Sequence, residues 1–135
     1  MSSVEYYSNE AGGTPTKPGY FTSLDAREPF PLTDGVVVRA VLGEYCMVNF
    51  VEFALGGAAP AHSHGEEQVV LVLEGEVEFG LGDEVRTLGP REAVVVSPWV
   101  MHSALCTSEG GARTIEVFGP PRAALLDLMG ISLPI

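Results

Sequence analysis

Three histidines are the residues of this sequence best suited to hold a metal ion, and they occur in two short stretches. His62 and His64 are separated by one serine, and His102 follows the apolar run at residues 93–96 and the segment 97–101. A metal site needs several neutral imidazoles that converge on one point. Side chains on an extended strand alternate between faces, so a His-X-His pair places two imidazoles on one face. The pattern therefore predicts that the three histidines bind one metal ion.

The same alternation identifies Gln68 as the fourth ligand. Gln68 has the parity of His62 and His64, whereas Glu67 falls on the opposite face unless a β-bulge intervenes. Three imidazoles and an amide oxygen suit several divalent transition metals, namely zinc, nickel, iron, manganese or cobalt. Because the amide is neutral, the ion keeps its full charge, which strengthens Lewis-acid polarisation and does not stabilise a higher oxidation state. This ligand set favours an isomerase or lyase over an oxygenase.

These residues resemble the first sequence motif of the cupin superfamily. The matching positions are Gly56, His62, His64, Glu67, Gln68 and Gly75. The second motif matches less closely, since Ser97 and Trp99 stand where the family usually has Pro and Gly, but His102 falls at the expected position. The resemblance implies a small single-domain cupin with an antiparallel β-barrel and a bound metal.

A more specific resemblance lies at residues 116–122, which read Glu-Val-Phe-Gly-Pro-Pro-Arg. The pectin-degradation cupins that open the ring of unsaturated uronates have Asp-X-Phe-Ser-Pro-Pro-Arg, and the resemblance covers residues 36–128. It implies that Glu116 transfers a proton, that Phe118 is an apolar wall that fixes the ring, and that Arg122 binds a carboxylate. Glu116 replaces the usual Asp, which leaves the identity of the substrate open.

Short strands separated by turn-forming residues make up most of the chain. The expected strands are residues 36–42, 45–54, 68–73, 76–81, 85–88, 93–96, 102–107 and 113–118. Only residues 123–129 are predicted to be helical, with Pro121 at the first helical position and Gly130 as the C-terminal cap. Residues 1–20 are polar and rich in Gly and Pro, which predicts a flexible tail before a single domain at residues 21–135. The pattern favours an all-β fold of jelly-roll type.

Composition limits the partners of the chain. Eighteen acidic and seven basic residues give a net charge of -11, which repels nucleic-acid phosphates and anionic lipid headgroups. The apolar runs are too short to span a membrane, which takes about 20 residues. The 46% hydrophobic content is enough for one core, with some apolar residues left for an interface. Together with a mean hydropathy of +0.23 and the oligomeric state usual among the cupins that the sequence resembles, it predicts a homodimer.

The cysteines and the N-terminal sequence bear on the location of the protein. Cys46 and Cys106 form no CxxC motif, and the first ten residues contain neither a basic residue nor an apolar run. We therefore expect a reduced, cytoplasmic protein.

The leading functional hypothesis is a metal-dependent enzyme that acts on a small oxygenated substrate. The best candidate is a uronate-like sugar acid, with a hydroxyl or carbonyl polarised by the metal and a proton moved by Glu116. A metal-dependent dioxygenase is the alternative, and oxygen consumption with ferrous iron separates the two. A non-enzymatic binding or sensor module is a third class, which would show metal and ligand binding without turnover.

Overall fold

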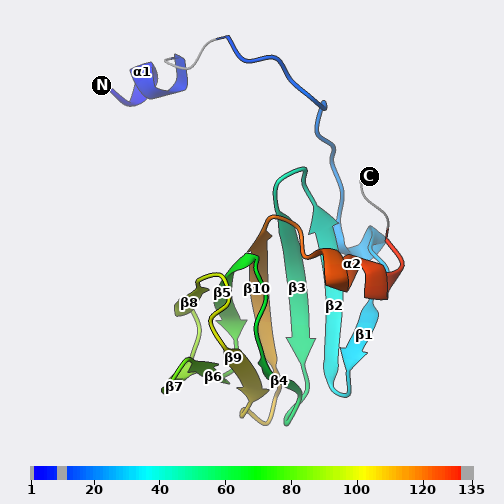
Figure 1. Cartoon of the computed structure of the whole chain (residues 1–135), viewed down its shortest axis with the longest axis vertical. Coiled ribbons are helices and arrows are strands. Elements are labelled where there is room, and N and C mark those ends of the chain that lie inside the picture. The colour runs from blue at the N-terminus through cyan, green and yellow to red at the C-terminus, as the bar shows by residue number, and fades with distance from the viewer. Residues whose placement is uncertain (1, 9–11, 132–135) are drawn as a thin grey trace.

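Two antiparallel sheets enclose the interior of the protein in a computed structural model that describes residues 2–8 and 12–131 (Figure 1). The first sheet has the strand order β1 (Phe30–Thr33), β2 (Val36–Leu42), β3 (Met47–Phe53), β10 (Ala112–Gly119), β5 (Glu67–Glu74) and β8 (Ala93–Val96). The second has the order β4 (Ala58–His62), β9 (His102–Cys106), β6 (Val77–Leu81) and β7 (Glu84–Leu88). This two-sheet arrangement confirms the predicted all-β jelly roll.

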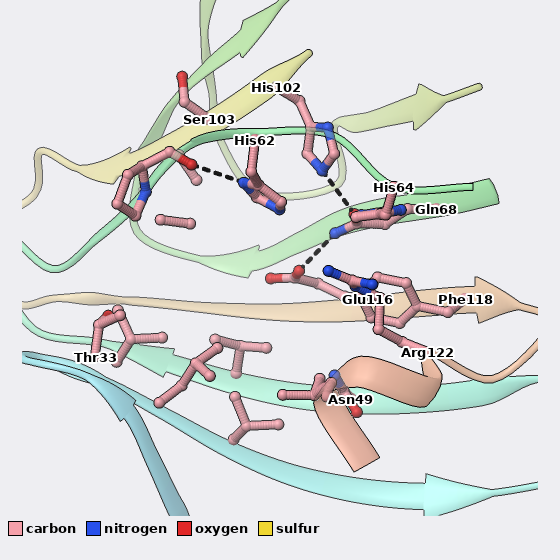
Figure 2. A pocket seen from close by; sticks show the side chains of 18 of the residues that line it. Thr33, Asn49, His62, His64, Gln68, His102, Ser103, Glu116, Phe118 and Arg122 are labelled. Carbon is pink, nitrogen blue, oxygen red and sulfur yellow. Dashed lines mark hydrogen bonds between the residues drawn. The ribbon is translucent and has the colours of Figure 1, made fainter. Parts of the chain in front are cut away.

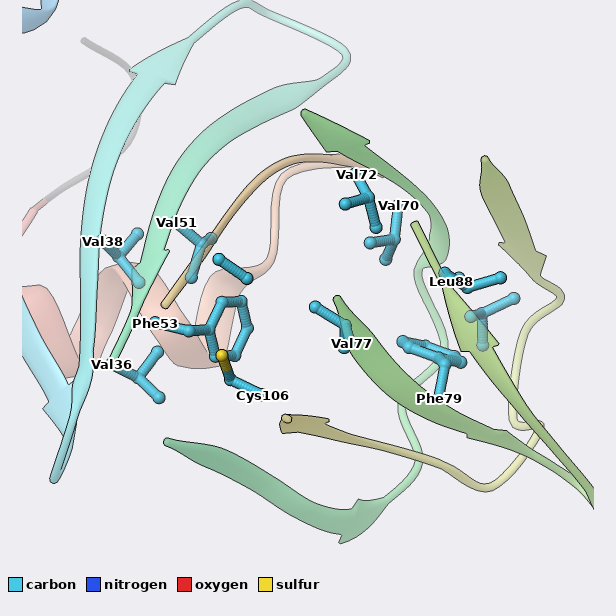
Figure 3. Close-up of a cluster of buried hydrophobic side chains, with 12 residues drawn as sticks. Val36, Val38, Val51, Phe53, Val70, Val72, Val77, Phe79, Leu88 and Cys106 are labelled. Carbon is cyan, nitrogen blue, oxygen red and sulfur yellow. The ribbon is translucent and has the colours of Figure 1, made fainter. Parts of the chain in front are cut away.

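The hydrophobic core lies between the inner faces of the two sheets. Buried and more exposed residues alternate along β2 and along most of β3 and β5, as strands with one covered face require. Side chains from both sheets meet in one cluster (Figure 3), whose buried members include Val38, Val51, Val70, Val72, Val77, Phe79 and Cys106. Full burial of a valine or phenylalanine side chain contributes about 1.5–3 kcal/mol. The alternation therefore both stabilises the sandwich and fixes which side chains point inward.

The eight predicted strands are present, with ends that differ from the prediction by at most two residues. Strands β1 and β4 were not predicted, because Pro31 interrupts the first and the second reads Ala-Ala-Pro-Ala-His, with no β-branched residue. These two strands therefore form through pairing with β2 and β9 rather than through local preference.

Helix α2 (Ala123–Met129) occupies the residues that were predicted to be helical, and Gly130 caps its C-terminus with a left-handed φ of 74°. The expectation for Pro121 is wrong. The N-cap is Arg122, whose carbonyl oxygen accepts hydrogen bonds from the N–H groups of Leu125 and Leu126. Pro121 therefore precedes the helix instead of opening it.

The N-terminal part contains two short helical segments that were not predicted, α1 (Ser3–Ser8) and the 3-10 turn η1 (Leu24–Ala26). The signal for α1 is a Ser-X-X-Glu sequence, in which the N–H of Glu5 donates to Ser2 Oγ at 3.1 Å. Figure 1 shows α1 apart from the sheets.

The end of the predicted tail contacts the first sheet, because the Tyr20 hydroxyl donates to the carbonyl of Leu42 at 2.5 Å. The domain division after residue 20 stays a prediction.

None of the helices in the described part of the chain combines the length and the hydropathy of a membrane-spanning segment.

Candidate metal centre

The three histidines converge at one end of the space between the sheets (Figure 2). His62 ends β4 and pairs in register with His102, the first residue of β9, while His64 lies two residues beyond β4. Their candidate ligand nitrogens all lie within 4.8 Å of one another. The His-X-His pair therefore does not share one strand as expected, because β4 ends at His62. The predicted convergence of the three rings is nevertheless present.

Backbone carbonyl groups orient all three rings. The Nδ1–carbonyl distances are 2.7 Å from His62 to Pro60, 3.0 Å from His64 to Glu66 and 2.8 Å from His102 to Val100. A neutral ring that donates its Nδ1–H to a carbonyl keeps a lone pair on Nε2. Proteins hold metal-binding imidazoles in this way.

Gln68 lies at the fourth position of this cluster. Its side chain is 5% exposed on the inner face of β5, whereas Glu67 is exposed, as the alternation predicts. Gln68 Oε1 is 3.0 Å from Nε2 of His64 and 3.1 Å from Nε2 of His102. With a lone pair on each Nε2, both nitrogens and the Gln68 oxygen are hydrogen-bond acceptors, so they repel one another at these distances. A cation bound between the two nitrogens and the oxygen removes that repulsion. The donor set therefore fits a divalent metal ion.

The surroundings of His64 and His102 also favour the neutral form of both imidazoles. Burial is the largest cause that lowers the pKa of His64, and the positive charge of Arg122 acts in the same direction. Burial likewise lowers the pKa of His102. Only a neutral imidazole binds a metal ion, so both shifts favour the metal-binding form.

Glu116 lies beside this cluster, on the inner face of β10. Gln68 Nε2 donates to its Oε1 at 2.8 Å, and Thr114 Oγ1 donates to its Oε2 at 2.8 Å. Burial raises the pKa of Glu116, and these two hydrogen bonds act in the opposite direction. A carboxyl group with a raised pKa beside a metal-binding cluster is suited to proton transfer.

The two other residues of the 116–122 segment also reach the site. Phe118 is buried on the inner face of β10, with its ring centroid 5.7 Å from that of His64. Arg122 places Nη1 3.4 Å from Oε1 of Glu66. Sequence reasoning missed Glu66, which precedes β5 and contacts Arg122 across 56 residues of sequence.

One cavity of about 400 Å³ joins the predicted site residues. His62, His64, Gln68, His102, Glu116, Phe118 and Arg122 all line it. Its remaining wall is mostly apolar and includes Val36, Val38, Val51 and Phe53. The volume is that of a site for a small organic molecule, which typically has about 300–1,000 Å³.

Asn49 also lines this cavity and was missed by sequence reasoning. The residue is 2% exposed, and its Oδ1 has no hydrogen-bond partner among residues 2–8 and 12–131. A buried polar atom without a partner costs about 1–3 kcal/mol. A single Asn within a strand gives no sequence signal, because only the fold reveals that its neighbours leave it unpaired.

Comparison with known proteins identifies the family. A sequence model of the Cupin domain matches residues 49–118, which are 70 of the 135 residues. The chain belongs to the cupin family. Cupins commonly bind divalent metals, in agreement with the group of three histidines. No curated protein matches the sequence significantly.

Solved structures show the same fold. KdgF from Halomonas sp. is 26% identical to this cupin, with a TM-score of 0.74 over 80% of this chain and 99% of the other. An RmlC-like cupin from Shewanella frigidimarina is 24% identical, with a TM-score of 0.74 over 79% and 96% of the two chains. The cupin domain of Cnp3 from Schizosaccharomyces pombe is 15% identical, with a TM-score of 0.64 over 87% and 85%. The last two likenesses concern the fold alone.

Proposed function

We propose that this cupin is a metal-dependent enzyme that isomerises a small oxygenated substrate, namely a uronate-like sugar acid, with opening of its ring. The observation that carries the proposal is a direct link between two functional groups. The amide of Gln68 contacts His64 and His102 through its oxygen and Glu116 through its nitrogen. The resemblance of residues 116–122 to the pectin-degradation cupins and the likeness to KdgF support this substrate class.

Four side chains would hold the metal: His62, His64, Gln68 and His102. A divalent ion bound there supplies a Lewis acid that polarises a hydroxyl or carbonyl oxygen of the substrate. The candidates are zinc, nickel, iron, manganese and cobalt, since imidazole and amide donors accept all of them.

Glu116 moves the proton in this proposal. Isomerisation changes no atom count, so one carboxylate that accepts a proton and returns it to another atom of the substrate is sufficient. The hydrogen bonds from Gln68 and Thr114 hold the carboxylate in place. The pectin-degradation cupins usually have Asp at this position, and the two hydrogen bonds support the longer Glu side chain in the same role.

Arg122 and Phe118 position the substrate. Arg122 is 3.4 Å from the carboxylate of Glu66, which is longer than the about 2.7–2.9 Å of a good charge-assisted hydrogen bond. A substrate carboxylate can therefore compete with Glu66 for the guanidinium group. Phe118 provides an apolar surface beside His64 against which a sugar ring packs.

A homodimer in a reducing, cytoplasmic setting belongs to the same proposal. The outer face of the larger sheet supports the dimer, because one row of paired residues across five strands consists of Val41, Val48, Val117, Val69 and Val95. Val95 is 56% exposed. Such a surface suits a second copy of the chain. Sedimentation at micromolar concentration tests the dimer, and a monomer would refute it.

The activity is tested with 4,5-unsaturated uronates and protein of measured metal content. We expect the ultraviolet absorbance of the conjugated double bond to disappear, a keto acid to form, and both changes to stop after chelation. Oxygen uptake with ferrous iron, without uronate turnover, would favour a dioxygenase. Metal and ligand binding without any turnover would identify a binding module.

A further inference from the structure

Asn49 is a polar exception on the inner face of β3. That face also carries Met47, Val51 and Phe53, which are apolar and buried. Asn49 is itself 2% exposed and lines the cavity, while its Oδ1 has no hydrogen-bond partner in the described part of the chain. Buried side-chain amides in folded proteins nearly always have partners. A water molecule or a bound ligand can therefore supply the partner that the described residues do not.

The two in-register neighbours of Asn49, Ala40 on β2 and Glu116 on β10, do not supply that partner, and Ala40 has no polar side-chain atom. Asn49 pairs in register with Glu116 on β10, so both side chains project from the same face. The oxygens of Glu116 already accept hydrogen bonds from Gln68 and Thr114. Figure 2 shows Asn49 on the side of Glu116 away from Gln68, near helix α2. A molecule that reaches Glu116 in the cavity also comes within reach of Asn49.

We propose that Asn49 binds a hydroxyl group of the substrate and makes the site selective for hydroxylated acids over plain carboxylic acids. A hydroxyl group complements a side-chain amide, because its O–H donates to Oδ1 and its oxygen accepts from Nδ2–H. Asn49 lies across Glu116 from the histidines, so the hydroxyl it binds is distinct from the oxygen that faces the metal. This inference rests on the proposed function, since it names a group of the same substrate.

The difference between two non-reacting probes tests this role. D-galacturonate is a saturated uronate with several hydroxyl groups, and cyclohexanecarboxylate places the same carboxylate on a six-membered ring without hydroxyls. We expect the metal-loaded parent protein to prefer galacturonate. In Asn49→Leu, which keeps a similar shape, the Kd for galacturonate should rise about 10-fold or more, since buried polar groups discriminate strongly against mismatched partners. The Kd for cyclohexanecarboxylate should not rise.

Stability and a matched variant separate binding from a structural role. Asn49→Leu should keep its metal and melt at the same temperature as the parent or higher, because an unpaired buried amide is removed. Asn49→Val serves the same purpose if leucine does not fit. Thr33→Val, which removes a hydroxyl from another part of the cavity wall, should leave the preference between the probes unchanged.

Several results would overturn the proposal. They are a parent protein that shows no preference for galacturonate, a loss of affinity for both probes in the Asn49 variants, or a fall in the melting temperature of both variants. Because neither probe reacts, failure to turn over unsaturated uronates would refute the proposed reaction without changing the outcome of this binding comparison.

Discussion

Strands β5 and β10 run side by side from the candidate metal centre into the hydrophobic core, and the side chains at their two ends differ in chemistry. From the site to the core, the inner face carries Gln68, Val70 and Val72 on β5, and Phe118, Glu116, Thr114 and Ala112 on β10. At the core end, Val72 is fully buried among apolar side chains. At the site end, Gln68 and Glu116 are held by hydrogen bonds in fixed directions.

The difference between the site end and the core end shows that the same alternation of side chains along β5 and β10 positions both polar and apolar residues. Alternation along each strand decides which side chains point inward, and it does so equally for Val72 and for Gln68. Chemistry depends on the few inward positions where a polar residue replaces an apolar one. Substitutions at the site end should therefore change metal binding and turnover, whereas substitutions at the core end should change stability.

The largest effect is expected for His102→Ala. The variant removes one of three converging imidazoles and one contact of Gln68, so metal analysis should show that bound metal is lost, and uronate turnover should fall to background. Chelation of the parent protein should give the same loss, but added metal should restore only the parent. A variant that keeps both metal and turnover would exclude His102 from the site.

The second-largest effect on turnover is expected for Glu116→Gln. The substitution keeps shape and removes proton transfer, so turnover should fall about 10²-fold or more while metal content stays unchanged. Glu78→Gln makes the same chemical change at an exposed position of β6 and should leave turnover at the parent level. Equal turnover in the parent and both variants would assign proton transfer to another group.

Arg122→Ala should act on binding instead. Hydrogen bonds to charged groups contribute about 1.5–3 kcal/mol, so KM for a uronate should rise about 10–100-fold. Because the clamp holds a non-reacting carboxylate, kcat should change little. Arg113→Ala, which removes an exposed arginine of β10, is the matched control. A large fall in kcat with unchanged KM would contradict the assignment.

Local alternation of side chains predicts the strands and the choice of Gln68 over Glu67, but it does not place His64, which lies two residues beyond β4. Val36–Leu42 and Ala93–Val96 agree with the predicted strands, and Gln68 rather than Glu67 faces the histidines. Strand β4 was not predicted, because its residues have weak strand preference and pair only through the fold. The correct predictions of the strands and of Gln68 therefore rest on the alternation of side chains along a strand.

Two site residues lay beyond prediction for a different reason. Glu66 contacts Arg122 across 56 residues of sequence, and no local pattern signals that pairing. Asn49 is distinguished by its Oδ1, which has no hydrogen-bond partner within the part of the chain that the structure describes. Contacts between distant segments decide both roles, and they appear only once the strands are placed.

The smallest effect on activity is expected for Val72→Ala, at the core end of the strand that carries Gln68. Val72 has no exposed surface, so loss of its two methyl groups should lower the free energy of unfolding by about 1–3 kcal/mol through lost burial and a residual cavity. Denaturant unfolding measures this loss. Metal content, kcat and KM at a temperature well below melting should equal those of the parent, because Val72 is not among the residues that line the cavity. A fall in metal content or turnover would mean that packing in the core positions Gln68, and the two ends of β5 would then have to be treated as one unit.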